Sequence, residues 1–280
     1  KLVSSDKFGT MFECPNLVSF EDNNYIIMSP QNIKEKDGNF ANVSSCVYFK
    51  LKGDFIHEEQ TIEKVKEIDH GLEYYAPTVY DDEKILVNWV QMWGRRYYLD
   101  EIHNDFINTF SLFKKVKEKD GVLSFTPLSL ENYVTEKKIE KIKLNGESQT
   151  YHNCYVHYQV KFEKDEELCL TIEFFNSKQD KVNFVIDCKN NIYQLDRSNV
   201  SIPLNGVEDS YAKDGKRYLK KEIPSNCVID IYIDNAYVEI YFDNFEEGFS
   251  FINFSKEDGF SLKSNKLVEI SLLSENIEVK

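Results

Sequence analysis

The fold class is decided by the stretch Ile229-Asp230-Ile231-Tyr232-Ile233-Asp234, which is followed by Asn235-Ala236 and then by Tyr237-Val238-Glu239-Ile240-Tyr241-Phe242. Both runs are rich in β-branched and aromatic residues, and two turn residues separate them. Alternation with a period of two places one set of side chains on one face of a strand. The stretch therefore predicts a β-hairpin with one apolar face per strand, and two packed antiparallel sheets would bury such faces.

Similar runs cover most of the remaining chain. Residues 46–51 and 168–174 alternate in the same way, whereas Ile85–Val90 is apolar on both faces and predicts a covered inner strand. Residues 112–116 and 122–125 predict a second hairpin. Short runs at this spacing are typical of a sandwich, barrel or propeller, although no repeat of about 40–45 residues is obvious. The sequence thus predicts an all-β protein.

The pattern changes between residues 127 and 143. Apolar residues at roughly helical spacing among Glu and Lys predict a short amphipathic helix there, and these residues are Leu130, Tyr133, Val134 and Ile139. We therefore expect a first β domain over residues 1–130, a linker with the short helix over residues 131–148, and a second β domain over residues 149–280.

Charge and cysteine content exclude several classes of function. Lys and Arg total 34 against 48 Asp and Glu, for a formal net charge of -14. The chain therefore lacks the basic face of a nucleic-acid binder, and an anionic membrane surface is disfavoured as a partner. The 6 Cys have no CxxC spacing and the 5 His have no ligand spacing, so neither a metal nor another cofactor is predicted. No apolar run approaches the roughly 18 residues of a membrane span, and we expect a cytoplasmic protein.

One carboxylate lies among apolar residues near the start of the sequence, in Met11-Phe12-Glu13-Cys14-Pro15-Asn16-Leu17. A poorly solvated carboxyl group holds its proton to higher pH, which is what a general acid near neutral pH needs. A lone glutamate at a strand end is more often solvated or paired. Glu13 is therefore a candidate acid/base group only if other features support it.

Such features follow in the sequence, and together they resemble glycoside hydrolase family 32, the invertases, fructanases and sucrose-6-phosphate hydrolases. The acid/base motif of that family reads Glu-Cys-Pro after Trp or Phe, and Phe12-Glu13-Cys14-Pro15 is similar to it. Asp69-His70-Gly71-Leu72-Glu73-Tyr74-Tyr75-Ala76-Pro77 resembles the family segment Asp-Tyr-Gly-Phe-Asp-Phe-Tyr-Ala-Pro. Ile85–Val90 resembles the strand with a pocket-lining Trp, and Leu195-Asp196-Arg197-Ser198 with the later hairpin resembles the sandwich signature.

The resemblance implies the later blades of a five-bladed β-propeller followed by a C-terminal antiparallel β-sandwich. It also implies retaining hydrolysis of a β-fructofuranoside such as sucrose, sucrose 6-phosphate or a fructan. One carboxylate would attack the anomeric carbon while Glu13 protonates the leaving oxygen and then activates water. The residues that the resemblance assigns to sugar binding are Cys14, Asp69, Tyr74, Tyr75, Trp89 and Arg95.

Several of these residues also fit a purely structural role. Asp69 could fix the turn before Gly71 instead of contacting the leaving group. The three aromatic residues could belong to the core instead of stacking on a furanose ring. Arg95 and Arg96 could lie in a solvated loop instead of holding a substrate phosphate by bidentate bonds.

Parts of the family pattern are missing. The nucleophile motif Asn-Asp-Pro-Asn and the Arg-Asp-Pro motif should precede Glu-Cys-Pro, and neither occurs in the 280 residues. A Pro-Arg-Glu motif is not recognisable either. We expect about two blades, on the order of a hundred residues, to lie upstream or on a separate chain that completes the propeller. The alternative is a truncated or degenerate relative that binds carbohydrate without catalysing a reaction.

Overall fold

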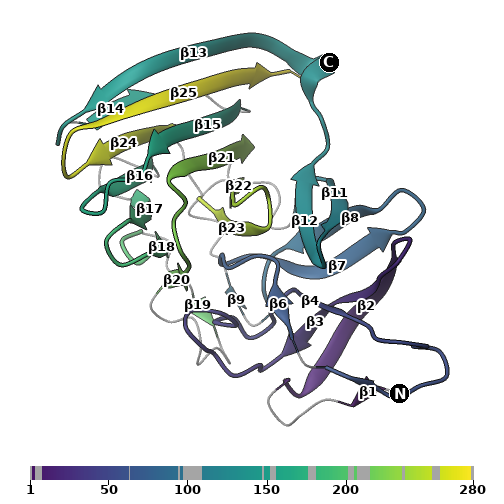
Figure 1. Ribbon diagram of the computed structural model, residues 1–280. Helices are drawn as coiled ribbons and strands as arrows, with labels where there is room; N and C mark the ends of the chain where they lie inside the picture. Colours follow the sequence, from purple (N-terminus) through teal and green to yellow (C-terminus); the bar gives the residue numbers. More distant parts are fainter. Residues whose placement is uncertain are drawn as a thin grey trace.

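Strands account for almost all regular structure in the computed structural model (Figure 1). It describes residues 2–3, 8–62, 64–93, 95–96, 109–146, 148–151, 156–175, 181–200, 205–206, 215–234, 237–253 and 259–278. Within these ranges no helix is long and apolar enough to cross a membrane. The N-terminal part of the chain forms propeller blades, and the C-terminal part forms a two-layered sandwich. This confirms the predicted all-β class and its two architectures.

The first blade is a 4-stranded antiparallel sheet in the order β2-β3-β4-β6. Its strands are β2 (Met11–Ser19), β3 (Asn24–Gln31), β4 (Val47–Lys50) and β6 (Lys66–Glu67). Both faces of the blade are covered by apolar side chains, with Tyr25 and Ile27 on one face and Met28 and Phe49 in a separate cluster. Strand β2 lies at the edge of this sheet.

The second blade has the order β7-β8-β11-β12, with β10 also beside β8. Its strands are β7 (Tyr75–Tyr80), β8 (Ile85–Val90), β10 (Thr109–Phe110), β11 (Lys114–Lys119) and β12 (Val122–Pro127). Strand β8 is the predicted inner strand, and β11 with β12 is the predicted hairpin. One core cluster, which includes Val18 and Tyr25 of the first blade and Leu86 and Phe125 of the second, holds the two blades together.

Two 6-stranded antiparallel sheets form the sandwich. The first contains β13 (Val134–Leu144), β25 (Val268–Ile277), β15 (Val156–Glu163), β21 (Asn226–Asp234), β22 (Tyr237–Phe242) and β23 (Glu247–Ile252), in that order. The second contains β14 (Ser148–Tyr151), β24 (Phe260–Ser264), β16 (Cys169–Phe175), β17 (Lys181–Asp187), β18 (Ile192–Asp196) and β20 (Lys216–Lys220), in that order. Strands β21 and β22 pair as the sequence predicted, while the expected turn at Asn235-Ala236 lies outside the described residues.

Two short strand pairs connect distant segments. Strands β1 (Leu2–Val3) and β5 (Gln60–Thr61) pair in parallel. Strands β9 (Arg95–Arg96) and β19 (Asn205–Gly206) pair antiparallel, which joins the segment after β8 to the connection between β18 and β20 of the sandwich.

The prediction of a helix in the linker over residues 131–148 is wrong. A single 3-10 turn, η2 (Glu131–Tyr133), precedes strand β13, which pairs with β25 along its length. Tyr133 and Ile139, expected on a buried helical stripe, are 44% and 67% exposed. An isolated short helix is marginal in water, whereas pairing along β25 satisfies the backbone of β13. Sandwich strands therefore begin at Val134 and not at residue 149.

The segment between β6 of the first blade and β7 of the second meets the sandwich at a close backbone contact. Asp69 Oδ1 accepts hydrogen bonds from the Gly71 amide at 2.8 Å and the Ser250 amide at 3.1 Å, and its Oδ2 accepts one from Ser250 Oγ at 2.7 Å. A Cβ atom on Gly71 would lie 2.1 Å from Ser250 O, so only glycine permits this approach. Asp69 thus fixes both the turn before Gly71 and strand β23.

A buried ion pair reinforces the same interface. Lys114 Nζ lies 2.9 Å from Glu239 Oε2, and both side chains are 1% exposed. Glu239 Oε1 also accepts a hydrogen bond from the Leu112 amide at 2.6 Å, and its Oε2 accepts one from the Tyr241 hydroxyl. The Lys114 ammonium lies 4.9 Å from the centre of the Tyr74 ring. Charge, hydrogen bonds and an aromatic face therefore compensate the burial of both ions.

His70, where the family segment has Tyr, forms a second charged contact across the interface. Its Nε2 lies 2.8 Å from Glu247 Oε2, and its Nδ1 lies 3.3 Å from Glu67 Oε2. Burial alone would lower the pKa of His70, but the two carboxylates outweigh burial and raise it to about 10. Lys221 Nζ contacts Glu247 from the other side at 2.7 Å. His70 is therefore charged at neutral pH and links β6 of the first blade to β23.

Stability should depend on the charge of His70. A pKa raised from 6.5 to about 10 means that this contribution is fully present below about pH 6.5 and is lost as the pH rises towards 10. We expect the free energy of unfolding to fall between pH 7 and pH 10, and H70Q to remove much of that fall. Urea unfolding at several pH values measures it. The control is H57Q, because the His57 side chain is 78% exposed; equal slopes for H70Q and H57Q would contradict the prediction.

Candidate active site

Two β-bulges shape the blade surface where β2 meets β7. The register of β2 against β3 shifts between Glu13 and Asn16, and that of β7 against β8 shifts between Tyr75 and Thr78. In each bulge a residue with positive φ precedes a proline: Cys14 at 51° and Ala76 at 50°. A bulge adds one residue to a strand and redirects the neighbouring side chains, and proline is tolerated there because the ladder is already interrupted.

Asn16 ties the two bulges together. Its Nδ2 donates to Cys14 O at 2.8 Å and to Pro77 O at 2.9 Å, and its Oδ1 accepts from the Val79 amide at 3.0 Å. One side chain thus satisfies backbone groups of both strands, which would otherwise lack a partner at the interrupted ladders. This bridge fixes β2 against β7 and sets the position of Glu13 relative to Tyr75.

The Glu13 carboxylate is held by two donors on the same oxygen. Gln31 Nε2 donates to Glu13 Oε2 at 2.6 Å, and the Tyr75 hydroxyl donates to the same atom at 2.5 Å. Among the described residues none donates to Oε1. The carboxylate is half-buried, so Oε1 can meet a ligand while Oε2 is fixed in place.

Aromatic rings adjoin this carboxylate. The Tyr75 ring lies 5.9 Å from that of Trp89 and 6.2 Å from that of Trp93, and the two Trp rings are 5.5 Å apart. Burial raises the pKa of Tyr75, and the hydrogen bond to Glu13 raises it further, so the hydroxyl remains a donor. Trp93 is 55% exposed and presents its ring to solvent. The site therefore combines a fixed carboxylate with an accessible aromatic surface.

The chain resembles known proteins in sequence and in fold. Residues 1–127 match the family model of the glycosyl hydrolases family 32 N-terminal domain. The sucrose-6-phosphate hydrolase of Vibrio alginolyticus is 26% identical over 240 residues, which cover 81% of this chain and 45% of the relative. The sucrose-6-phosphate hydrolase structure from Lactobacillus gasseri superposes with a TM-score of 0.79 at 18% identity, covering 98% of this chain and 56% of that one. Through residues 1–127 the chain matches glycoside hydrolase family 32.

A structure from Bombyx mori extends the comparison within family 32. A variant of its beta-fructofuranosidase in complex with sucrose superposes with a TM-score of 0.76 at 17% identity, covering 98% of this chain and 55% of that one. The chain thus spans about half the length of the relatives it matches. The matched part includes both described blades and the sandwich, in agreement with the fold described above.

The structure separates the site residues expected from family 32 into groups. Glu13, Tyr75 and Trp89 lie together, with Cys14 next to Glu13 in the bulge. Partial burial and the neighbouring Glu13 raise the pKa of the Cys14 thiol, which keeps it uncharged. The backbone of Arg95 lies in β9, but its side chain is outside the described residues.

Two expected sugar-binding residues have structural positions instead. Tyr74 is 2% exposed and belongs to the core that joins the blades, where its ring faces Lys114. Asp69 is also buried, and its carboxylate bonds to Gly71 and Ser250 at the sandwich interface. Burial raises the pKa of Asp69 to about 6, against the effect of these hydrogen bonds. Both residues match the structural alternatives that the sequence left open.

Two residues of the site were not predicted from sequence, namely Gln31 and Trp93. Gln31 pairs with Met11 in the register of β2 and β3, which brings its amide to Glu13. Trp93 lies four positions after Trp89, and the pair makes up the 2 Trp of the whole chain. Their proximity in sequence was the available signal for an aromatic surface at this point.

Proposed function

We propose that this chain supplies the acid/base half of a fructosyl hydrolase that acts on β-fructofuranosides with retention of configuration. The observation that carries the proposal is the Glu13 carboxylate, fixed through Oε2 by Gln31 and Tyr75 beside the exposed Trp93 ring. The match of residues 1–127 to family 32 supports the same reading, as does the Glu-Cys-Pro motif in which Glu13 stands.

In the proposed mechanism Glu13 acts through Oε1. Protonated Oε1 gives its proton to the leaving oxygen as a nucleophilic carboxylate attacks the anomeric carbon and the glycosidic bond breaks. The Glu13 carboxylate then takes a proton from water, whose oxygen attacks the anomeric carbon and releases the nucleophile. Tyr75 and Gln31 hold Oε2 as an acceptor throughout, which keeps the other oxygen directed at the substrate.

The proposed mechanism also needs a second carboxylate, the nucleophile. Retaining enzymes place their two carboxyl groups about 5 to 5.5 Å apart. Among the described residues no other carboxylate hydrogen-bonds with the Glu13 cluster, and the family's nucleophile motif is not among the 280 residues. We propose that an upstream segment or a separate chain supplies it next to β2, which is an edge strand with exposed Met11 and Phe12.

The proposed substrates are sucrose and sucrose 6-phosphate. The named activity of the curated relatives is sucrose-6-phosphate hydrolysis, and the Bombyx mori variant was determined in complex with sucrose. Trp93 and Trp89 offer an aromatic surface for the apolar face of a sugar ring. If the phosphorylated sugar is used, we propose that Arg95 contacts its phosphate.

The test is turnover of sucrose and sucrose 6-phosphate by the 280-residue chain alone and after addition of a segment that carries Asn-Asp-Pro-Asn. We expect no turnover by the chain alone, and release of fructose with retained configuration by the completed protein. Turnover by the chain alone would place the nucleophile within these residues. Sugar binding without turnover by the completed protein would favour the alternative, a carbohydrate-binding relative that catalyses nothing.

A further inference from the structure

The inner face of the sandwich changes from apolar to charged side chains along its edge strand β13. Even-numbered residues of β13 share one face, and Ile142 and Leu144 of this set are buried in the sandwich core. At the preceding even positions the strand carries Glu136, Lys138 and Glu140. Inner faces of sandwiches are normally apolar along each strand. Three consecutive charged positions on this face therefore need a reason other than core packing.

The neighbouring strand β25 shows the same change at the same level. Ser274 pairs with Lys138 and Asn276 pairs with Glu136, whereas the next residues of the row, such as Ile270 opposite Ile142, belong to the core. The polar row continues to β15, where Tyr158 pairs with Ser274. The polar end of the face is thus built from three adjacent strands and not from one side chain.

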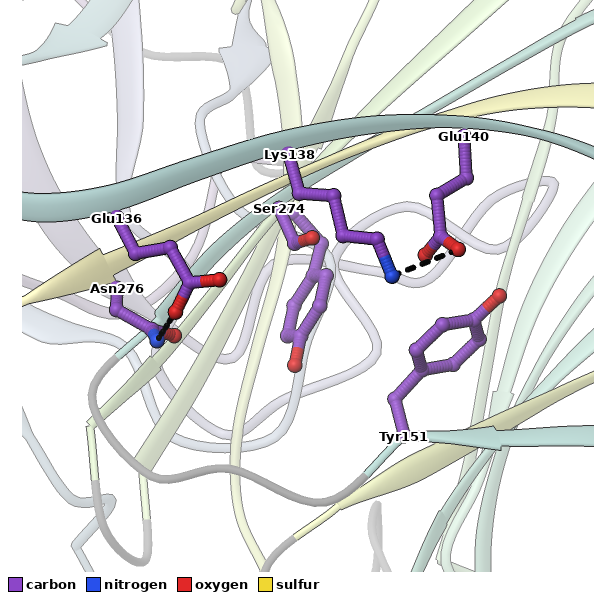
Figure 2. Close-up of a pocket in the computed structure, with 7 residues that line it drawn as sticks. Glu136, Lys138, Glu140, Tyr151, Ser274 and Asn276 are labelled. Atoms are coloured by element: carbon purple, nitrogen blue, oxygen red, sulfur yellow. Dashed lines mark hydrogen bonds and ion pairs between the residues drawn. The ribbon is translucent and has the colours of Figure 1, made fainter.

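A cavity of about 200 Å³ occupies this place. It is lined by Glu136, Lys138, Glu140, Tyr151, Tyr158, Ser274 and Asn276. Figure 2 shows charged groups of β13 above the cavity and the Tyr151 ring on its opposite side. Tyr151 belongs to β14, the edge strand of the second sheet, so the cavity lies where the edges of the two sheets face each other. In Figure 1 this edge is at the opposite end of the molecule from β2.

Most polar groups of the cavity are paired with one another, and Asn276 Nδ2 donates to Glu136 Oε2 at 3.1 Å, but Tyr151 differs from them. The Tyr151 ring is stacked on Phe260, with ring centroids 5.1 Å apart. Its hydroxyl is shielded from solvent, yet it has no hydrogen-bond partner among the described residues. Lys138 Nζ lies 2.8 Å from Glu140 Oε1, and these side chains are 59% and 29% exposed. Such an exposed ion pair is weak, so a ligand can displace it at little cost.

We propose that this cavity binds one neutral sugar ring. Carboxylates of Glu136 and Glu140 accept hydrogen bonds, Lys138 and Asn276 donate them, and Ser274 can do both, which matches hydroxyl groups that donate and accept. Two carboxylates disfavour an anion, while the central ammonium of Lys138 disfavours a cation. The volume is below the roughly 300–1,000 Å³ of sites for larger ligands, so the occupant is a single ring.

A titration of the 280-residue protein followed by amide NMR tests this site. We expect D-glucose or D-fructose at millimolar concentration to shift the backbone amide signals of Lys138 and Ser274. Y151F should raise the Kd about threefold to tenfold, as expected for loss of one neutral hydrogen bond. Fructose 6-phosphate should bind more weakly than fructose, because the two carboxylates repel its phosphate.

The matched control is Y133F, the same chemical change at a Tyr that is 44% exposed and does not line the cavity. It should bind sugar as the unmodified protein does. The inference is overturned if no sugar shifts the β13 and β25 signals, if Y151F binds with an unchanged Kd while its thermal unfolding matches that of Y133F, or if the shifts occur only around Glu13. None of these outcomes depends on the function proposed for Glu13.

Discussion

Glu13→Gln is expected to lower kcat of the completed hydrolase by about 10²- to 10⁴-fold, with KM for sucrose changed little. Glutamine keeps the size of the side chain, and its amide can remain near Gln31 and Tyr75, which both contact Oε2 in the wild-type protein. It cannot deliver a proton to the leaving oxygen or accept one from water. Initial rates of fructose release at several sucrose concentrations separate the two kinetic constants.

Glu21→Gln is the matched control for this substitution. Glu21 is exposed in the turn between β2 and β3, so E21Q makes the same chemical change outside the site. It should leave kcat unchanged. Equal turnover for E13Q and the unmodified protein would refute the acid/base role of Glu13. A rise in KM at unchanged kcat would assign Glu13 to sugar binding alone.

Lys114→Met should have the largest effect on stability, a loss of about 3–5 kcal/mol in the free energy of unfolding. Both Lys114 and Glu239 are 1% exposed, so removing the ammonium leaves the Glu239 carboxylate buried without its counter-ion. The hydrogen bonds from Leu112 and Tyr241 remain, but they do not supply a positive charge. Urea unfolding followed by tryptophan fluorescence measures the change.

Lys115→Met tests the same chemical change one residue away. Lys115 is paired to Thr126 across β11 and β12, and its ammonium is exposed where it bonds to Glu83 O, so the expected change is within about 0.5 kcal/mol. Adding E239Q to K114M should restore much of the loss, because no buried charge is then left unpaired. A loss below about 1 kcal/mol for K114M alone would show that the ion pair is not what holds this interface.

The predictions from sequence succeeded where one face of a strand is uniformly apolar. The hairpin of β21 and β22 follows from alternation alone, because both strands bury one face in the sandwich. Strand β13 was mistaken for a helix because its inner positions Glu136, Lys138 and Glu140 are charged, which hides a period of two. The charged positions that hide the strand pattern are the same ones that line the cavity.

Only some contacts of the Glu13 site follow from the sequence, because others depend on how distant segments are brought together. Tyr74 and Tyr75 are adjacent in the chain, but Tyr74 packs in the core that joins the blades and only Tyr75 reaches Glu13. Gln31 could not be found from sequence, because its contact depends on the register of β2 against β3. The contact of Asp69 with Ser250 could not be found from sequence either, because the two residues are 181 positions apart in the chain.

The paired bulges at Cys14 and Ala76 place a constraint on chain length. Glu13 pairs with Ser29 and Asn16 pairs with Ile27, so the one additional residue between them keeps Glu13 and Asn16 on the same side of β2. Loss of one residue there would turn Glu13 to the opposite side and move it away from Tyr75. Insertions and deletions should therefore be excluded from both bulges in functional relatives, even where the identity of the residue with positive φ changes.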